Sequence, residues 1–266
     1  AALAVQKLVR EKGGIAMYSG PATTRLTEDD CAENGFHWMF DTYSSAAGAA
    51  VALTKAGDKS WFFVTVDYAF GHSLEKDASD MVKANGGTVV GSVRHPLNAS
   101  DFSSFILQAQ NSKAQVIGLA NGAQDTVNAI KAAREFGITG AKGQKVAALL
   151  MFLTDVHSLG LRQAQGLMFS EGFYWDMDDK TRAFSTRFEK LHKGYKPTMV
   201  QAGVYSSTLH YLKSVAAAKT DDSKVIAQKM RELPIDDPVM RNASIRPDGR
   251  VIHDMYLFQV KAPNES

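Results

Sequence analysis

The sequence predicts an α/β fold in which helices cover both faces of a parallel sheet. Two observations carry this prediction: apolar runs of strand length alternate with amphipathic helical patterns, and the loops that join them are short. Ligands of open parallel sheets lie beyond the carboxyl ends of the strands. The functional edge is therefore expected at four loops, which cover residues 19–24, 67–71, 120–125 and 151–155.

The first predicted elements are a helix over residues 2–11 and a short strand over residues 15–18. A loop of small residues, 19–24, follows the strand. Thr27 stands where it would cap a further helix, and the acids of residues 28–30 would then lie in the first turn, where the helix dipole favours them. A cation site at these acids is the less favoured interpretation.

Three strand–helix units come next, each with a buried-strand run followed by a helical pattern. Their strands, with a fourth strand after them, cover residues 61–66, 88–93, 116–120 and 146–151. The first helix ends at Asn85, and the other two cover residues 101–110 and 125–136. Ser100 or Asp101 is placed to cap the second of these helices.

The pattern changes after Gly166. A strand over residues 167–170 is followed by three helices, and the chain then ends in two short strands that flank a turn at residues 247–249. The three helices are predicted over residues 181–192, 202–218 and 222–233.

The composition limits the class of partner. The 266 residues are enough for one large or two medium domains, and 45% of them are hydrophobic. A net charge of +2, with scattered basic residues, argues against nucleic acid or an anionic membrane surface as a partner. No apolar stretch approaches the ~20 residues that span a bilayer. The single cysteine, Cys31, excludes an internal disulfide and is interpreted as a small buried hydrophobe rather than a nucleophile.

The common catalytic motifs are missing from this sequence. It has no nucleophile elbow, phosphate-binding loop or dinucleotide-binding glycine pattern, and no two histidines stand four residues apart. One cysteine cannot build a thiolate metal cluster. His95 precedes a proline at a strand end and is interpreted as a loop histidine. The sequence therefore predicts a binding module without a cofactor or metal rather than an enzyme.

Four segments resemble the type I periplasmic binding proteins of ABC importers, in the branch that binds leucine, isoleucine and valine. They occur in the expected order over essentially the whole chain. The resemblance extends to the proteobacterial group that binds aromatic acids, through residues 95–98 and 171–176. The four segments are residues 17–27, the D-x-x-F-G loop at 67–71, the D-F-S helix start at 99–104 and the R-x-x-G helix end at 132–137.

This resemblance implies two doubly wound parallel-sheet lobes joined by a three-crossing hinge. The crossings are expected near residues 40–42, 170–172 and 240–242. Lobe 1 would then comprise residues 1–41 and 173–238, and lobe 2 residues 42–172 and 239–266. Members of the family normally begin with further residues that carry the opening strands of lobe 1. The sequence is therefore expected to be part of a longer periplasmic chain, whose signal peptide and first strands lie outside it.

The resemblance also places the ligand. It implies that the loop with Ser19, Pro21, Ala22 and Thr23 anchors a carboxylate; Thr23 offers a hydroxyl and an N–H, whereas Pro21 offers only its carbonyl. From the other lobe it implies three further positions, Phe70, Asn121 and Ala123.

The end of the fourth strand differs from that of the amino-acid binders. Those proteins place a glutamate there for the ligand ammonium, whereas this sequence has Met151 and Phe152, and Asp155 is out of register. Met151 and Phe152 would either pack the strand end or form an apolar wall for an aryl ring. Tyr174 would contact the ring or the hinge, or else pack in the core.

The expected function is that of an extracytoplasmic solute-binding protein of an ABC importer. Its expected ligand is a benzoate or phenylpropanoid held between two closing lobes. The protein is expected to be a monomer, and its expected partner is an ABC permease in the inner membrane. A branched-chain amino acid is the second ligand class. A ligand-sensing domain of a receptor on the same fold is a further alternative, and an enzyme on a doubly wound sheet is the third class.

Overall fold

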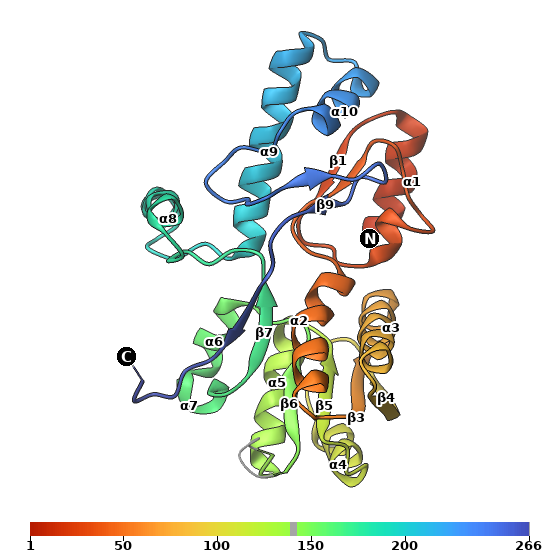
Figure 1. The fold of residues 1–266 in the computed structure, drawn as a ribbon, viewed down its shortest axis with the longest axis vertical. Coiled ribbons are helices and arrows are strands. Elements are labelled where there is room, and N and C mark those ends of the chain that lie inside the picture. The colour runs from red at the N-terminus through yellow and green to blue at the C-terminus, as the bar shows by residue number, and fades with distance from the viewer. Residues whose placement is uncertain (139–142, 266) are drawn as a thin grey trace. The chain divides into compact units, whose positions relative to one another are not determined.

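The computed structural model describes residues 1–138 and 143–265 (Figure 1). By its internal contacts the chain divides into two compact units. The chain passes from one unit to the other after Asp41, Glu171 and Met255. Unit 1 comprises Ala1–Asp41 and Gly172–Met255, and unit 2 comprises Thr42–Glu171 and Tyr256–Ser266.

Unit 2 contains a six-stranded sheet in the order β10-β7-β6-β5-β3-β4. All neighbouring strands are parallel except β10, which returns from the C-terminal end of the chain and pairs antiparallel with β7. The predicted α/β class with a mostly parallel sheet is confirmed. The strands are β3 (Ser60–Val66), β4 (Thr88–His95), β5 (Val116–Ala120), β6 (Lys145–Ala148), β7 (Met168–Glu171) and β10 (Tyr256–Gln259).

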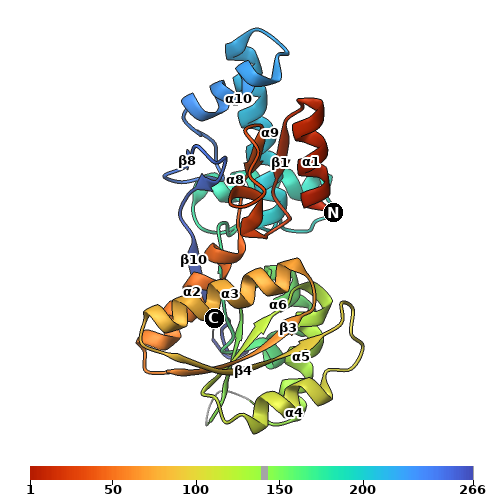
Figure 2. The same cartoon turned by 90° about the vertical axis from the view of Figure 1, so that its right-hand side faces the viewer.

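Helices cover both faces of this sheet (Figure 2). On one face α2 (Thr42–Lys55) packs against α3 (Ala69–Ala84), and on the other α4 (Ser103–Asn111) packs against α5 (Ala123–Glu135), with α6 (Leu153–Leu159) and α7 (Leu161–Ala164) beside it. Six consecutive residues of β3 are buried, as expected for a parallel strand covered on both sides. Burying this apolar surface supplies the main favourable free energy of the unit.

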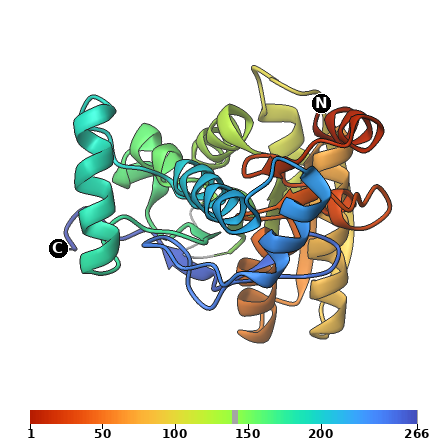
Figure 3. The same ribbon diagram turned by 90° about the horizontal axis from the view of Figure 1, so that it is seen from above.

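Unit 1 holds a smaller set of strands. β1 (Ala16–Tyr18) and β2 (Gly35–His37) form a parallel pair, and β8 (Ser244–Ile245) and β9 (Val251–Ile252) form an antiparallel hairpin. Its helices are α1 (Ala2–Lys12), the 3₁₀ turn η1 (Thr24–Thr27), α8 (Asp179–Leu191), α9 (Met199–Ala218) and α10 (Ser223–Glu232). The helices α9 and α10 pack on each other (Figure 3).

Side-chain caps account for where several helices begin. Asp178 accepts the Thr181 N–H at the start of α8, and Asp222 accepts two N–H groups of the first turn of α10. Asp101 was one of two residues predicted to cap α4, but the N-cap position is Phe102; Asp101 precedes it and accepts the Ser103 N–H at 2.8 Å. α1 ends at Gly13, whose φ of 70° lies in the left-handed region that glycine tolerates.

The helix predicted after Thr27 is wrong. Residues 24–27 form only the 3₁₀ turn η1, and the Thr27 hydroxyl donates to the Thr24 carbonyl instead of capping. The cause lies in α1, because the buried Gln6 amide donates to the carbonyls of Leu26 and Asp30, at 2.6 Å each. Carbonyls bonded to a side chain in this way do not start a regular helix.

Cys31 also departs from its interpretation, because it lies outside any helix and is only half-buried. Its thiol lies 3.4 Å from the Asp248 carbonyl, to which it donates. Burial and the nearby Asp248 charge raise the pKa of the thiol, so the thiolate form that makes a cysteine nucleophilic is disfavoured.

The segment of residues 239–255, assigned to lobe 2 from the sequence, lies in unit 1. The reason is a buried ion pair: the guanidinium of Arg250 donates to the Asp41 carboxylate at 2.5 Å and to the Trp38 carbonyl at 3.0 Å. In addition, the His37 N–H donates to the Gly249 carbonyl at 2.9 Å. These bonds attach the β8–β9 hairpin to β2, and the third crossing therefore falls after Met255.

Candidate ligand-binding site

The loop after β3 places Phe70 at the carboxyl edge of the unit 2 sheet. This loop turns tightly into α3, and a Cβ on Gly71 would lie 2.1 Å from the Val66 carbonyl oxygen. Only glycine permits this close approach. The Phe70 ring is half-buried, and its centroid lies 5.8 Å from that of Tyr68.

Three of the predicted loops meet beside Phe70. A Cβ built on Gly122 would lie 3.4 Å from Leu150 Cδ2 and 3.7 Å from Phe70 Cε1. The loops after β3, β5 and β6 are therefore contiguous, and the absent side chain of Gly122 leaves space between them. Ala123, the first residue of α5, is exposed and has a φ of 52°.

Asn121 is buried and takes part in a hydrogen-bond network. Its Nδ2 lies 3.1 Å from His95 Nε2, and its Oδ1 accepts the Thr126 hydroxyl at 2.9 Å. His95 Nδ1 lies 2.9 Å from the Pro96 carbonyl, so a neutral ring with its proton on Nδ1 satisfies both contacts. His95 is thus a fully buried strand-end residue rather than a loop histidine. The network joins the ends of β4 and β5 and uses Asn121 to position the loops.

The two residues after β6 differ in accessibility. Met151 is fully buried in the hydrophobic core of unit 2, together with Val127, Ile130 and Phe169. Phe152 is half-buried and stands at the N-cap of α6. The side chain of Met151 therefore packs the strand end, and Phe152 has accessible surface at this edge.

Two buried acids lie at the start of α6. Glu171, the last residue of β7, is 2% exposed and accepts the Leu153 N–H at 3.0 Å. Asp155 accepts the Phe152 N–H at 2.8 Å. Desolvation, with a smaller contribution from the Asp155 charge, raises the pKa of Glu171 to about 8, although the bond from Leu153 opposes this shift. Burial likewise raises the pKa of Asp155.

Sequence reasoning did not select Glu171 as a site residue, although its signal was available: an acid directly follows the strand predicted over residues 167–170. It also missed Asp125, which is 3% exposed. One oxygen of Asp125 accepts the Asn98 N–H at 3.1 Å, and the other has no hydrogen-bond partner within residues 1–138 and 143–265.

In unit 1 the predicted carboxylate loop follows β1. Ser19, Ala22 and Thr23 are buried, and Pro21 is exposed. His37 Nε2 lies 2.8 Å from the Pro21 carbonyl and donates to it, so this carbonyl is already bonded within the protein. Burial, and secondarily the positive charge of Arg250, lower the pKa of His37 to about 4, which keeps the ring neutral at pH 7.

Two hydroxyls at this loop are buried without a hydrogen-bond partner among the described residues, those of Ser19 and Tyr18. Burial raises the pKa of Tyr18 to about 12, so its hydroxyl keeps its proton and can donate. Tyr18 was missed as a site residue, and its position at the end of β1 is the signal that would have found it. Tyr174, the remaining predicted residue, has its ring 5.6 Å from that of Trp175 in the segment after β7.

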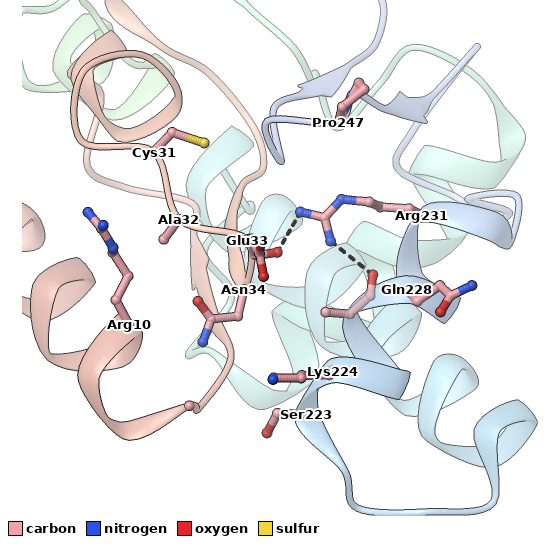
Figure 4. A pocket seen from close by; sticks show the side chains of 12 residues that line it. Arg10, Cys31, Ala32, Glu33, Asn34, Ser223, Lys224, Gln228, Arg231 and Pro247 are labelled. Atoms are coloured by element: carbon pink, nitrogen blue, oxygen red, sulfur yellow. Dashed lines mark hydrogen bonds between the residues drawn. The ribbon is translucent and has the colours of Figure 1, made fainter.

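Unit 1 also has a cavity of about 630 Å³, which lies elsewhere (Figure 4). Glu33 and Asn34 line it just before β2, whereas the predicted loop follows the carboxyl end of the parallel strand β1. The cavity is therefore at the opposite edge of the strand pair. Arg231, in its wall, donates to the carbonyls of Glu33 and Ala227. None of the predicted site residues lines it.

Within the described part of the chain, no group of histidine, cysteine, aspartate and glutamate side chains is arranged to hold a metal ion. No helix in that part has both the length and the apolar character needed to cross a membrane.

The comparisons with known proteins agree on one family. A family model described as periplasmic binding protein matches residues 1–265. A periplasmic binding protein from Burkholderia mallei is 49% identical, with a TM-score of 0.95, over 98% of this chain and 69% of that chain. A protein from Burkholderia xenovorans, described as a branched chain amino acid ABC transporter periplasmic ligand-binding protein, is 38% identical, with a TM-score of 0.88, over 100% and 70%.

A third structure has the same fold at lower identity. The solute binding protein of an ABC transporter from R. palustris, in complex with benzoate, is 19% identical, with a TM-score of 0.87, over 98% of this chain and 71% of that chain. At this identity the likeness shows the fold alone. Among curated proteins, none matches this chain.

Proposed function

The chain belongs to the periplasmic binding protein family, the solute-binding proteins of ABC transporters, and we propose that its ligand is a small aromatic carboxylate. Family members of this kind bind and deliver a solute and are not enzymes. The ligand proposal, of the benzoate or phenylpropanoid type, rests on the charges and shapes of the residues at the two candidate loops.

The observation that carries the proposal is the absence of an available anion after β6. Residues 149–152 contain no acid, and the two nearby acids are used by the backbone: Asp155 accepts Phe152 N–H and Glu171 accepts Leu153 N–H. With a pKa of about 8, Glu171 is mostly neutral at pH 7. A desolvated ammonium without an anionic partner costs several kcal/mol. A carboxylate ligand that has no ammonium avoids this cost.

Aromatic surface at the unit 2 edge supports a ring in the ligand. Phe70 and Phe152 are both half-buried, and Gly122 adds no side chain between the loops that carry them. Aromatic pairs with offset or edge-to-face geometry contribute about 0.5–1.5 kcal/mol beyond the area they bury. Two such contacts would favour an aryl ring over an aliphatic side chain.

The carboxylate is proposed to bind at the unit 1 loop, as the family resemblance implies. The buried hydroxyls of Tyr18 and Ser19 can each donate a hydrogen bond, and Thr23 lies in the same loop. A buried donor without a partner costs about 1–3 kcal/mol. A ligand carboxylate that accepts from these hydroxyls would remove that cost, which supports an anionic ligand.

A branched-chain amino acid is the second candidate, and Asp125 favours it. The Asp125 oxygen without a partner could pair with a ligand ammonium. The Burkholderia xenovorans relative is described as a branched chain amino acid protein. Asp125 belongs to the first turn of α5, however, where the helix dipole already stabilises its charge.

In the proposed mechanism each unit supplies part of the site, and the ligand stabilises a closed arrangement through contacts that only this arrangement makes. An ABC permease in the inner membrane would then recognise the closed form. A receptor that senses the same ligand would use the same step, with a signalling partner in place of the permease.

A thermal-shift screen of the full-length protein tests the ligand class. Benzoate, 4-hydroxycinnamate and leucine are the probes, and a ligand at 100 times its Kd should stabilise the protein by about 2.7 kcal/mol. Stabilisation by benzoate or 4-hydroxycinnamate is expected. Stabilisation by leucine alone, abolished in Asp125→Asn, would establish the amino-acid alternative, and a screen without any shift would remove the basis for both.

A further inference from the structure

Glu171, at the end of β7, forms a hydrogen bond that lies outside the proposed ligand contacts. Glu171 and Asp155 accept two consecutive backbone N–H groups, those of Leu153 and Phe152. Asp155 belongs to α6 itself, so its bond is local to the turn that it caps. Glu171 comes from a different element, and its bond joins the start of α6 to the sheet.

This bond fixes the segment that follows β6. The core packing of Met151 holds one end of the segment, and the Leu153 N–H, bonded to Glu171, holds the other. Phe152 lies between these two attachments and is half-buried. The position of the Phe152 ring therefore depends on Glu171, although Glu171 is almost completely buried.

We propose that Glu171 is a positioning residue for ligand binding, which holds the Leu153 N–H and thereby sets the place of Phe152. This inference rests on the proposed function, because Phe152 contacts a ligand only in that proposal. Glu171 makes no ligand contact itself in this proposal, and ligand binding should depend on pH because Glu171 titrates.

The charged and titratable groups around Glu171 come from the elements that pack on β7 and from the segment before β10. α6 brings Asp155 and the exposed His157, and β10 brings Tyr256, which pairs with Glu171 across the sheet. The ring of His253 lies against Gly172, and burial lowers the pKa of this histidine. α2 and β6 have their charged residues, Lys55 and Lys145, at their far ends. Among these groups, the Asp155 charge is the one that shifts the pKa of Glu171.

Ionisation of Glu171 would leave a negative charge on a side chain that is only 2% exposed. Burial is the main cause of its raised pKa, and the Asp155 charge adds a smaller contribution. Loss of the proton should therefore draw the Glu171 carboxylate towards water and displace the start of α6, with Phe152, from its place. Because the pKa is about 8, this change should occur between pH 7 and pH 9.

The test compares the full-length protein with Glu171→Gln and Glu171→Leu. Glutamine has the shape of the neutral acid and keeps an oxygen for Leu153, whereas leucine removes the acceptor. Glu135→Gln, an exposed acid at the last residue of α5, is the matched control. Benzoate is the probe because it stays an anion from pH 6.5 to pH 9, and its Kd is measured by calorimetry across this range.

Wild type and Glu135→Gln should lose about tenfold in affinity between pH 7 and pH 9, since one proton must be retained for binding. Glu171→Gln should bind with a Kd that does not vary over this range. Glu171→Leu should bind about tenfold more weakly at pH 7, in line with a buried N–H that has lost its acceptor. The same pH profile in wild type and Glu171→Gln would overturn the positioning role.

A second readout needs no ligand. The NMR resonance of the Leu153 amide should titrate in wild type with a midpoint near pH 8 and should not titrate in Glu171→Gln. A Leu153 resonance that is unaffected between pH 6.5 and pH 9 in wild type would also overturn the inference. If benzoate, 4-hydroxycinnamate and leucine all fail to bind while Leu153 titrates as expected, the proposed function fails and the role of Glu171 at this turn stands.

Discussion

Replacing Glu171 by glutamine should stabilise the folded protein by an amount that grows with pH. The pKa of Glu171 is about 8 in the folded state, against 4.5 for an unperturbed glutamate. Because the folded value is the higher one, the stabilising contribution of Glu171 is complete below pH 4.5 and is lost as the pH rises to about 8. One pKa unit corresponds to about 1.36 kcal/mol, so keeping Glu171 neutral at pH 7 costs about 3 kcal/mol of the free energy of unfolding.

Urea unfolding of wild type, Glu171→Gln and the exposed control Glu135→Gln at several pH values from 4.5 to 8 measures this term. The excess stability of Glu171→Gln should rise by about 1.4 kcal/mol per pH unit, to about 3 kcal/mol at pH 7. The control should follow wild type throughout. An excess stability of the same size at pH 5 and pH 8 would refute the reasoning, because it would mean that Glu171 is ionised in the folded protein.

Three further substitutions test other parts of the structure by the same unfolding assay. Arg250→Met should destabilise unit 1 by about 3–5 kcal/mol, because it removes the buried guanidinium that pairs with the Asp41 carboxylate, and addition of Asp41→Asn should recover part of the loss. Gly71→Ala should cost about 1–3 kcal/mol, because its Cβ would overlap the Val66 carbonyl. A loss below about 0.5 kcal/mol, the range of ordinary surface substitutions, would contradict this expectation and show that the loop adjusts at little cost. Asn121→Leu should cost about 2 kcal/mol, since it leaves two buried groups without partners, and an unchanged midpoint would argue against the network.

The α/β class and most elements of unit 2 could be predicted because their signal is local. The apolar run at residues 61–66 becomes β3, which lies inside the sheet and is buried on both faces. The segment at 88–93 becomes β4, which lies at the edge of the sheet and alternates between exposed and partly buried residues. The alternation in β4 follows from the period of two along a strand, and the continuous burial of β3 follows from the coverage of both faces of the sheet.

The errors share a different cause, which is hydrogen bonding between residues that are distant in sequence. The Gln6 amide donates to the carbonyls of Leu26 and Asp30, and thereby prevents the helix predicted after Thr27. Arg250 reaches Asp41, which is 209 positions away, and thereby attaches the hairpin to unit 1. Neither side chain differs in type from many others in the sequence, so periodicity and capping rules cannot identify their partners.

The residue at position 151 does not by itself decide the charge at the end of β6. The sequence offers no acid at Met151, and from this alone the ligand ammonium would lack a partner. The structure places Glu171 beside the same turn, because β6 and β7 are neighbours whose carboxyl ends meet at one edge. Counting acids at that edge would therefore favour an amino acid. Counting charges does not, because burial keeps the proton on Glu171 at pH 7, and a neutral carboxyl gives an ammonium no ionic partner.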